Sequence, residues 1–182
     1  MENIVGVVKA YTTRVGAGPF PAEQNNEIGE YLRNTGHEFG TVTGRPRRCG
    51  WLDTAVVKYA AMLNSLDYLA ITRLDILDDL DTIKICTGYK YQGELLKEYP
   101  ASLDVLEQVE PVYEEMPGWK CHISDCKTYE ELPEAARKYV ERISELTEVP
   151  LASSPSARTA ARPSSCTTSS KRFLDFHHNN TT

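Results

Sequence analysis

An arginine-rich loop is the part of this 182-residue sequence with the clearest capacity for chemistry. Three arginines fall within residues 45–48, and Pro46 between them lacks an N–H and fixes its own dihedral, which predicts a loop rather than a helix. Guanidinium groups pair well with carboxylates and phosphates. Two threonine hydroxyls and the Gly44 backbone add donors. Residues 41–48 therefore predict a loop that wraps a small anionic ligand. The alternatives are a solvated basic turn and a nucleic-acid patch, and the overall charge disfavours the latter.

Asp75 is a second candidate, because it follows the apolar run 68–72, which is predicted to be a strand. Ligands of open α/β sheets bind beyond the carboxyl ends of the strands. A carboxylate there can accept hydrogen bonds from the ring N–H and the exocyclic amine of guanine, a pair of donors that adenine lacks. Arg73 would lie over such a base. The competing interpretation is an aspartate that only caps the next turn.

A glycine-rich turn and two further clusters are weaker candidates. Gly16 and Gly18 let the backbone approach a ligand closely, but a tight structural turn explains them as well. Cys121, His122 and Cys126 offer three zinc ligands without a convincing fourth. The acidic residues 78–81 lack the spacing of a calcium loop, and we expect them to form a solvated turn.

Composition narrows the function classes further. The chain is 41% hydrophobic and 25% charged, as globular proteins are, and its formal net charge of -6 argues against a nucleic-acid binder. No run approaches eighteen apolar residues, so no membrane span is expected. Five cysteines without framework spacing indicate a reduced, cytoplasmic protein.

Periodicity predicts the elements that must position these residues. The expected strands are 4–8, 68–72 and 82–91, and the expected helices are 22–34, 53–63 and 133–146. A buried strand at 4–8 needs neighbours, so either elements that preceded it are missing or the strand is simply N-terminal. Residues 91–93 predict a turn.

Two of the predicted helices have an expected apolar face. In the helix 53–63 it consists of Val56, Tyr59, Ala60 and Leu63. In the helix 133–146 it consists of Ala136, Tyr139, Val140, Ile143 and Leu146, with Pro133 suited to the first turn.

Taken in order, these segments resemble one family, the adenylosuccinate synthetases. The matching stretches are Lys9–Pro21, Glu38–Arg48, Gly50–Asp53, Thr72–Asp75 and Glu115–Trp119. The resemblance covers residues 3–151, a little under half of the family's chain from the C-terminal side. It implies an α/β fold that is part of a large mixed, mostly parallel sheet flanked by helices, truncated at its N-terminal side.

The resemblance also implies an activity. The family joins IMP and L-aspartate to form adenylosuccinate, using GTP and Mg²⁺, in AMP synthesis, and the intact enzyme is expected to be a homodimer. Residues implied to bind aspartate and IMP are Thr41, Val42, Thr43, Gly44, Arg45, Pro46 and Arg47. Arg45 would contact IMP. Those implied to bind GTP are Arg47, Arg73, Leu74 and Asp75.

Two departures from the family pattern qualify this implication. The family's phosphate loop, catalytic residues and Mg²⁺ ligands lie upstream of anything present here, so this chain alone is expected to be inactive. The alternative is a non-catalytic nucleotide-binding or interaction fragment.

The second departure is the segment 152–182, which is rich in Ser, Thr, Ala and Arg and is expected to be a disordered tail. Permitted codons for residues 155–171, read from the third base, encode Val-Gly-Pro-Asp-Arg-Ser-Gln-Thr-Ile-Val-Leu-His-Asp-Leu-Phe-Glu. That peptide resembles the end of the family's chain, so the tail is interpreted as a frame-shifted C-terminus.

Overall fold

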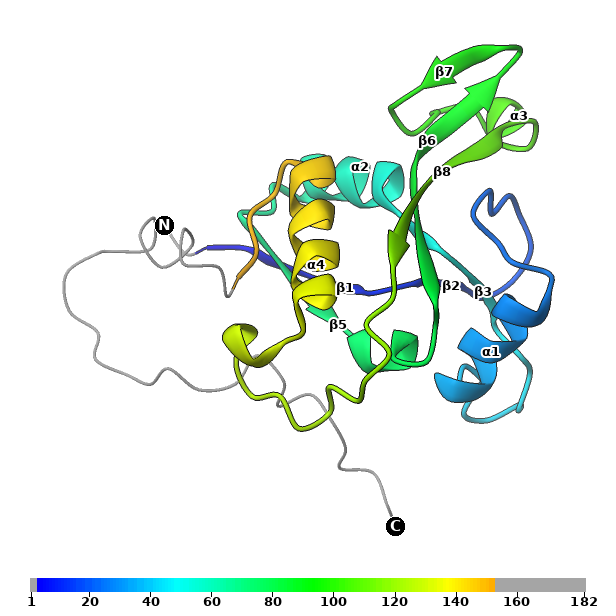
Figure 1. Ribbon diagram of the computed structural model, residues 1–182. Coiled ribbons are helices and arrows are strands. Elements are labelled where there is room, and N and C mark those ends of the chain that lie inside the picture. The colour runs from blue at the N-terminus through cyan, green and yellow to red at the C-terminus, as the bar shows by residue number, and fades with distance from the viewer. Residues whose placement is uncertain (1–2, 153–182) are drawn as a thin grey trace.

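The computed structural model describes residues 3–152, in which helices pack against short strands (Figure 1). The elements are β1 (Val5–Lys9), β2 (Thr12–Arg14), α1 (Glu27–Thr35), β3 (Arg48–Gly50), β4 (Leu52–Asp53), α2 (Thr54–Asn64), β5 (Tyr68–Thr72), η1 (Leu74–Leu77), β6 (Thr82–Tyr91), β7 (Glu94–Leu96), α3 (Leu103–Leu106), β8 (Glu110–Pro117), η2 (Tyr129–Glu131) and α4 (Glu134–Thr147). The predicted tail, 152–182, lies outside the described residues except for its first residue.

The strands form three small sheets. β1 pairs in parallel with β5, β2 pairs antiparallel with β3, and β6 is flanked by β4, β7 and β8. The expected α/β class with flanking helices is confirmed. The expected predominance of parallel pairing in one large sheet is not seen among residues 3–152, where two pairings are parallel and three are antiparallel.

The first strand forms where it was predicted, but it is not buried. Val5 and Val7 project from the same face of β1, and Val7 is 70% exposed. The other face packs inward, since Gly6 lies against the side chains of Leu66 and Leu69. The apolar run alone could not reveal that only one face of this strand is covered in the described part of the chain.

Helix α4 confirms its predicted apolar face and crosses in front of β1 and β5 in Figure 1. Ala136, Tyr139, Val140 and Ile143 are fully buried, and Pro133 precedes the helix as its N-cap rather than standing in the first turn. The Tyr139 hydroxyl donates to the Ala10 carbonyl at 2.6 Å, which fixes α4 to the end of β1.

Helix α2 also forms as predicted, but its buried face is not the predicted one. Thr54, Ala55, Val57 and Ala61 are buried, whereas Leu63 is 63% exposed. Because α2 is apolar nearly all round, its sequence could not specify which side packs on the core.

Helix α1 begins five residues later than the predicted start at residue 22. Asn26 is its N-cap, and the Asn26 side chain accepts hydrogen bonds from the backbone N–H groups of Ile28 and Gly29. The predicted stop at Gly36 is confirmed.

The hairpin between β6 and β7 confirms the predicted turn at residues 91–93. Gln92 and Gly93 both have positive φ, the combination that suits a two-residue hairpin loop. Strand β8 was not predicted from the sequence.

No helix within residues 3–152 is long and apolar enough to cross a membrane.

Candidate functional site

The carboxyl ends of β1 and β5 lie side by side, because the parallel register pairs Lys9 with Thr72. The backbone N–H of Ala10 donates to the Thr72 carbonyl at 2.8 Å and extends this pairing. Arg73 follows immediately and adopts a left-handed conformation with φ of 62°. Two cationic side chains therefore emerge from neighbouring strand ends, the edge at which α/β sheets bind ligands.

The predicted arginine loop is closed at its stem by backbone hydrogen bonds. The Arg47 N–H donates to the Glu38 carbonyl at 2.9 Å, and the Gly40 N–H donates to the Arg45 carbonyl at 2.8 Å. Between these bonds, Phe39 and Pro46 form an isolated antiparallel bridge.

Residues 41–44 at the tip of this loop are exposed, and Val42 is 96% exposed. The Thr43 hydroxyl does not point outward freely, since its oxygen accepts from the Arg45 N–H at 3.4 Å. The loop thus combines a fixed stem with a solvent-facing tip, an arrangement that suits a segment closing over a ligand.

Glu38 is the carboxylate around which the stem is organised. Its side chain is 3% exposed. Its Oε1 accepts from Lys9 Nζ and from the Tyr11 hydroxyl, both at 2.6 Å, while its Oε2 accepts from Arg47 Nη1 at 2.8 Å.

The charge on Glu38 follows from these contacts. Burial acts to raise the pKa of the Glu38 carboxyl, but the hydrogen bonds from its three donors outweigh that effect and hold the pKa below its usual range. For Tyr11 both causes act together, because burial and then the bond to Glu38 raise the pKa of its hydroxyl.

Arg73 is held by the same segment that carries Glu38. Arg73 Nη2 donates to the Gly36 carbonyl oxygen, at the C-terminal end of α1. Gly36 is tightly packed, since a methyl group added to it would lie 2.6 Å from the Leu32 carbonyl oxygen. Residues 36–38 therefore contact the guanidinium groups of both Arg47 and Arg73.

The two remaining residues of the predicted guanine site follow Arg73 in the short helix η1. Leu74 is 2% exposed, so its side chain belongs to the core. Asp75 is half-buried. That these residues contact a base stays a prediction.

Arg48, the third arginine of the cluster, does not join this site. It forms a two-point ion pair with Glu23, at 2.7 and 2.5 Å, and donates to the carbonyls of Gly16 and Gly18. Arg14 donates to two more carbonyls of the same turn. These contacts fit the structural interpretation of the glycine turn.

Asp78 departs from the expected solvated acidic turn. It is 4% exposed, and its two oxygens accept from Trp119 Nε1 at 2.7 Å and from the Ile123 N–H at 3.1 Å. Burial raises the pKa of its carboxyl. Asp78 therefore fixes the segment around Trp119 rather than holding a cation.

Within residues 3–152, no three His, Cys, Asp or Glu side chains are grouped so that they could hold a metal ion. The candidate zinc ligands at 121, 122 and 126 are included in that statement.

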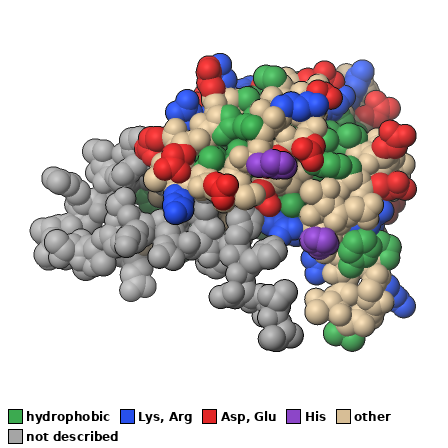
Figure 2. Space-filling view, turned by 60° about the horizontal axis from the view of Figure 1, so that its bottom comes forward, with side chains coloured by type: hydrophobic (Ala, Val, Ile, Leu, Met, Phe, Trp, Pro, Cys, Tyr) green, Lys and Arg blue, Asp and Glu red, His purple; other side chains and the backbone are tan. Residues whose placement is uncertain are grey.

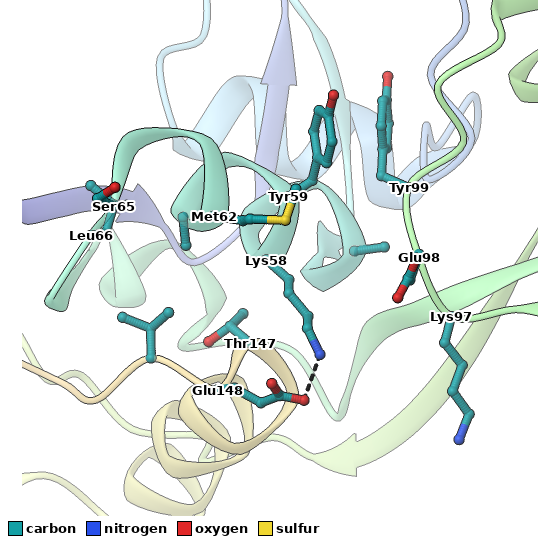
Figure 3. Close-up of a pocket in the computed structure, with 13 residues that line it drawn as sticks. Lys58, Tyr59, Met62, Ser65, Leu66, Lys97, Glu98, Tyr99, Thr147 and Glu148 are labelled. Carbon is teal, nitrogen blue, oxygen red and sulfur yellow. Dashed lines mark hydrogen bonds and ion pairs between the residues drawn. The ribbon is translucent and has the colours of Figure 1, made fainter.

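A pocket of about 540 Å³ lies away from the arginine loop, between α2, the end of α4 and the segment after β7 (Figure 3). Tyr59 and Tyr99 stack in it with ring centroids 5.3 Å apart. Lys58 and Glu148 form an ion pair across it at 2.5 Å. None of the predicted site residues lines this pocket.

The surface charge of the chain is mixed rather than segregated on the face that Figure 2 shows. Acidic and basic side chains are interspersed there among hydrophobic ones.

Sequence reasoning placed Arg47 and Arg73 but missed Lys9, Tyr11 and Glu38. Lys9 ends the apolar run of β1, so the strand-end argument applied to Asp75 would have found it. Glu38 had no comparable signal, because its donors lie on β1 and in the loop 29 and 9 residues away.

Comparisons with known proteins show which family the chain resembles. The sequence model of the adenylosuccinate synthetase family matches residues 1–159. The adenylosuccinate synthetase of Brachyspira hyodysenteriae is 60% identical over 148 residues, which are 81% of this chain and 35% of that protein. That of Desulforamulus reducens is 58% identical over 149 residues, or 82% and 35%.

A solved structure, described as fully ligated adenylosuccinate synthetase from Plasmodium falciparum, is also similar. It matches with a TM-score of 0.79 and 48% sequence identity, over 83% of this chain and 37% of that chain. The chain thus spans about 35% of the length of the curated relatives it matches. On the family match and these identities, the chain belongs to the adenylosuccinate synthetase family.

Proposed function

We propose that residues 3–151 supply the aspartate-, IMP- and GTP-contacting surface of an adenylosuccinate synthetase, the ligase of AMP synthesis that joins IMP and L-aspartate. The observation that carries this proposal is the loop 41–47. Its stem is closed by backbone hydrogen bonds, and its Arg47 is fixed beside the strand ends where Lys9 and Arg73 stand.

The loop residues divide by their exposure. Arg45 is exposed at the end of the tip and is assigned to IMP and aspartate. Arg47 is half-buried and held by Glu38, and it is assigned to GTP. A guanidinium that is already oriented loses less freedom when it binds an anion, which favours binding.

The guanine base is assigned to residues 73–75. Arg73 lies over the base, and Asp75 accepts its two N–H donors. Leu74 is buried, so any contact that it makes to the nucleotide uses its backbone. A carboxylate that is matched to two donors discriminates strongly against a base that lacks one of them.

Catalysis is assigned to the part of an intact synthetase that this chain does not match. Mg²⁺, when bound there, would neutralise charge on the transferring phosphate. The described residues bind and orient substrates in this proposal. The cytoplasmic location and the homodimer of the intact enzyme are part of the same proposal.

The alternative function is that of a nucleotide-binding or interaction fragment without catalysis. The observation that supports it is that the chain matches 35% of the length of its relative. An activity assay of two proteins distinguishes the synthetase function from the non-catalytic one. One is the 182-residue chain, and the other is a graft in which residues 3–151 replace the matching segment of the Brachyspira hyodysenteriae relative.

Adenylosuccinate formation from IMP, aspartate and GTP is measured for both proteins. We expect no turnover by the chain and turnover by the graft. A folded graft without turnover would contradict the proposed binding role, and robust turnover by the chain itself would contradict the assignment of catalysis to another segment.

A further inference from the structure

We propose that Glu38 is a positioning residue for this site: it orients Arg47 and joins it to Lys9, so that anionic substrate meets a preformed group of cations. The kinetic consequence rests on the function proposed above. The positioning itself rests only on the contacts of the described residues.

The first argument is the distribution of contacts on the two carboxylate oxygens. Oε1 accepts from the end of β1, through Lys9 and Tyr11, and Oε2 accepts from Arg47 in the loop. One buried side chain thus connects a strand of the sheet to a loop that is otherwise attached through its stem. Without it the two would be joined through backbone pairing, that of β2 with β3, and Arg47 would lose its side-chain connection to Lys9.

The second argument is the state of the Arg47 guanidinium. Its Nη1 is committed to Glu38, whereas its Nε is buried and makes no hydrogen bond within the described structure. That nitrogen is out of reach of a ligand, so the part of Arg47 that can meet an anion is the exposed third of its side chain, which Glu38 orients through Nη1.

The third argument is charge. Lys9, Arg47 and Arg73 are three cations near neighbouring strand ends, and without a carboxylate they would repel one another. Glu38 neutralises one of the three charges and leaves the group cationic. Its position therefore brings Lys9 and Arg47 together without cancelling the attraction of the three cations for phosphate or carboxylate.

The fourth argument is that the backbone on either side of Glu38 is itself fixed. The Glu38 N–H donates to the Arg33 carbonyl at 2.8 Å, and the Glu38 carbonyl accepts from Arg47. The preceding Gly36 accepts from Arg73. The segment 36–38 is thus a common support for the loop and the proposed guanine site.

A labelling experiment on the 182-residue chain tests the positioning directly. Phenylglyoxal modifies accessible arginines, and peptide mapping by mass spectrometry gives a rate for each one. In Glu38→Gln, Arg47 should react several-fold faster than in the wild type. An unchanged rate for Arg47 in a folded variant would overturn the inference.

The matched control is Glu114→Gln. Glu114 holds Arg142 by a two-point ion pair, beside a single contact from Glu145, and the Arg142 side chain is 36% exposed against 33% for Arg47. Glu114→Gln should accelerate Arg142 and not Arg47, while Glu38→Gln should do the reverse. If both arginines accelerate in Glu38→Gln, that variant has unfolded, and the next measurement decides.

Nitrogen-15 NMR reads the positioning in the wild-type chain, without a change at Glu38. A guanidinium held by a carboxylate rotates slowly about its Nε–Cζ bond, so the two Nη signals of Arg47 should be resolved. Loss of those signals in Arg47→Lys assigns them. A single averaged signal for Arg47 would overturn the inference.

Kinetics of the graft test the consequence for substrate. Glu38→Gln should raise the KM for GTP on the order of ten-fold, as loss of a charge-assisted hydrogen bond does, with a smaller change in kcat. Glu38→Asp should restore part of the loss, and Glu114→Gln should behave as the wild-type graft.

The two proposals fail in different ways. An inactive wild-type graft contradicts the proposed function and leaves the labelling and NMR results intact. An active graft whose KM for GTP is unmoved by Glu38→Gln contradicts the positioning role.

Discussion

A buried carboxylate remains charged only where its partners compensate for the lost hydration, and Glu38 meets that condition with three donors. Breaking a buried ion pair from one side costs on the order of 3 kcal/mol. Glu38→Gln should therefore lower the free energy of unfolding of the chain by about this amount at neutral pH.

The sign of the pH dependence follows from the lowered pKa of Glu38. Its stabilising contribution is present above the usual glutamate pKa and is lost as the pH falls through the lower folded-state value. Urea unfolding of the wild type and of Glu38→Gln should be measured between pH 7 and pH 3. The difference between their free energies of unfolding should become smaller as the pH falls. A difference that stays constant with pH would contradict the assignment of charge to Glu38.

The proposed guanine contact of Asp75 gives a second prediction at the residue scale. Asp75→Asn replaces one acceptor oxygen by a donor. The kcat/KM of the graft for GTP should therefore fall by a factor that corresponds to about 2 kcal/mol of transition-state stabilisation. Use of inosine triphosphate, which lacks the exocyclic amine, should fall less. Equal losses for the two nucleotides would show that Asp75 is only a turn residue.

At the scale of elements, Asp53 is what fixes the start of α2. Its Oδ1 accepts from the N–H groups of Ala55 and Val56, and its Oδ2 accepts from the buried Tyr89 hydroxyl at 2.7 Å. Asp53→Ala removes the cap and leaves the Tyr89 hydroxyl unsatisfied, so the chain should lose about 2–3 kcal/mol of stability.

Denaturant unfolding measures this loss. The matched control is Ser102→Ala, because Ser102 stands at the N-cap of α3 and makes no side-chain cap hydrogen bond. We expect its stability to change by less than about 0.5 kcal/mol. Similar losses in the two variants would indicate that the Asp53 contacts contribute little.

The elements that could be predicted from sequence are those whose apolar residues recur with a single helical or strand spacing and lie on one side of the element. Strands β5 and β6 have the predicted bounds, and α4 buries the predicted stripe. The face of α2 was predicted wrongly because both of its sides are apolar. Strand β8 was missed because it contains Glu and Pro, which are uncommon in strands, so its sequence does not have the typical strand pattern.

The site was predictable where one residue carries its own signal and not where a pair does. The arginines at 45 and 47 stand out in an acidic chain, and Arg73 follows an apolar strand. Glu38, the carboxylate that holds Arg47, is separated from Lys9 by 29 residues, and their contact can be recognised only once the fold brings them together. The ion pair of Arg48 with Glu23 is likewise distant in the sequence, so Arg48 could not be distinguished from Arg45 and Arg47.

For the molecule as a whole, the sequence of residues 155–171 predicts a frame change in the gene. The observed residues dictate most first and second bases, so each shifted triplet allows few choices, yet sixteen successive triplets fit a peptide resembling the end of the family's chain. Resequencing should reveal a one- or two-base difference near the codons for residues 151–154. Codons that are incompatible with the shifted triplets would remove the idea.

The exposed face of β1 should govern how the whole chain behaves in concentrated solution. Among the described residues β1 pairs only with β5, and Val7 is 70% exposed beside the half-exposed Val5. An open strand edge with apolar side chains promotes association between copies. Val7→Lys should therefore raise the concentration at which the chain associates, as measured by sedimentation equilibrium.

Stability should change by less than about 0.5 kcal/mol in Val7→Lys, since the side chain is already in water. Val42→Lys is the matched control, because Val42 is 96% exposed but lies at the tip of the arginine loop, far along the chain from β1. It adds the same charge and should leave association nearly unchanged. If both variants reduce association equally, net charge rather than the β1 edge controls it, and the edge is not the contact surface.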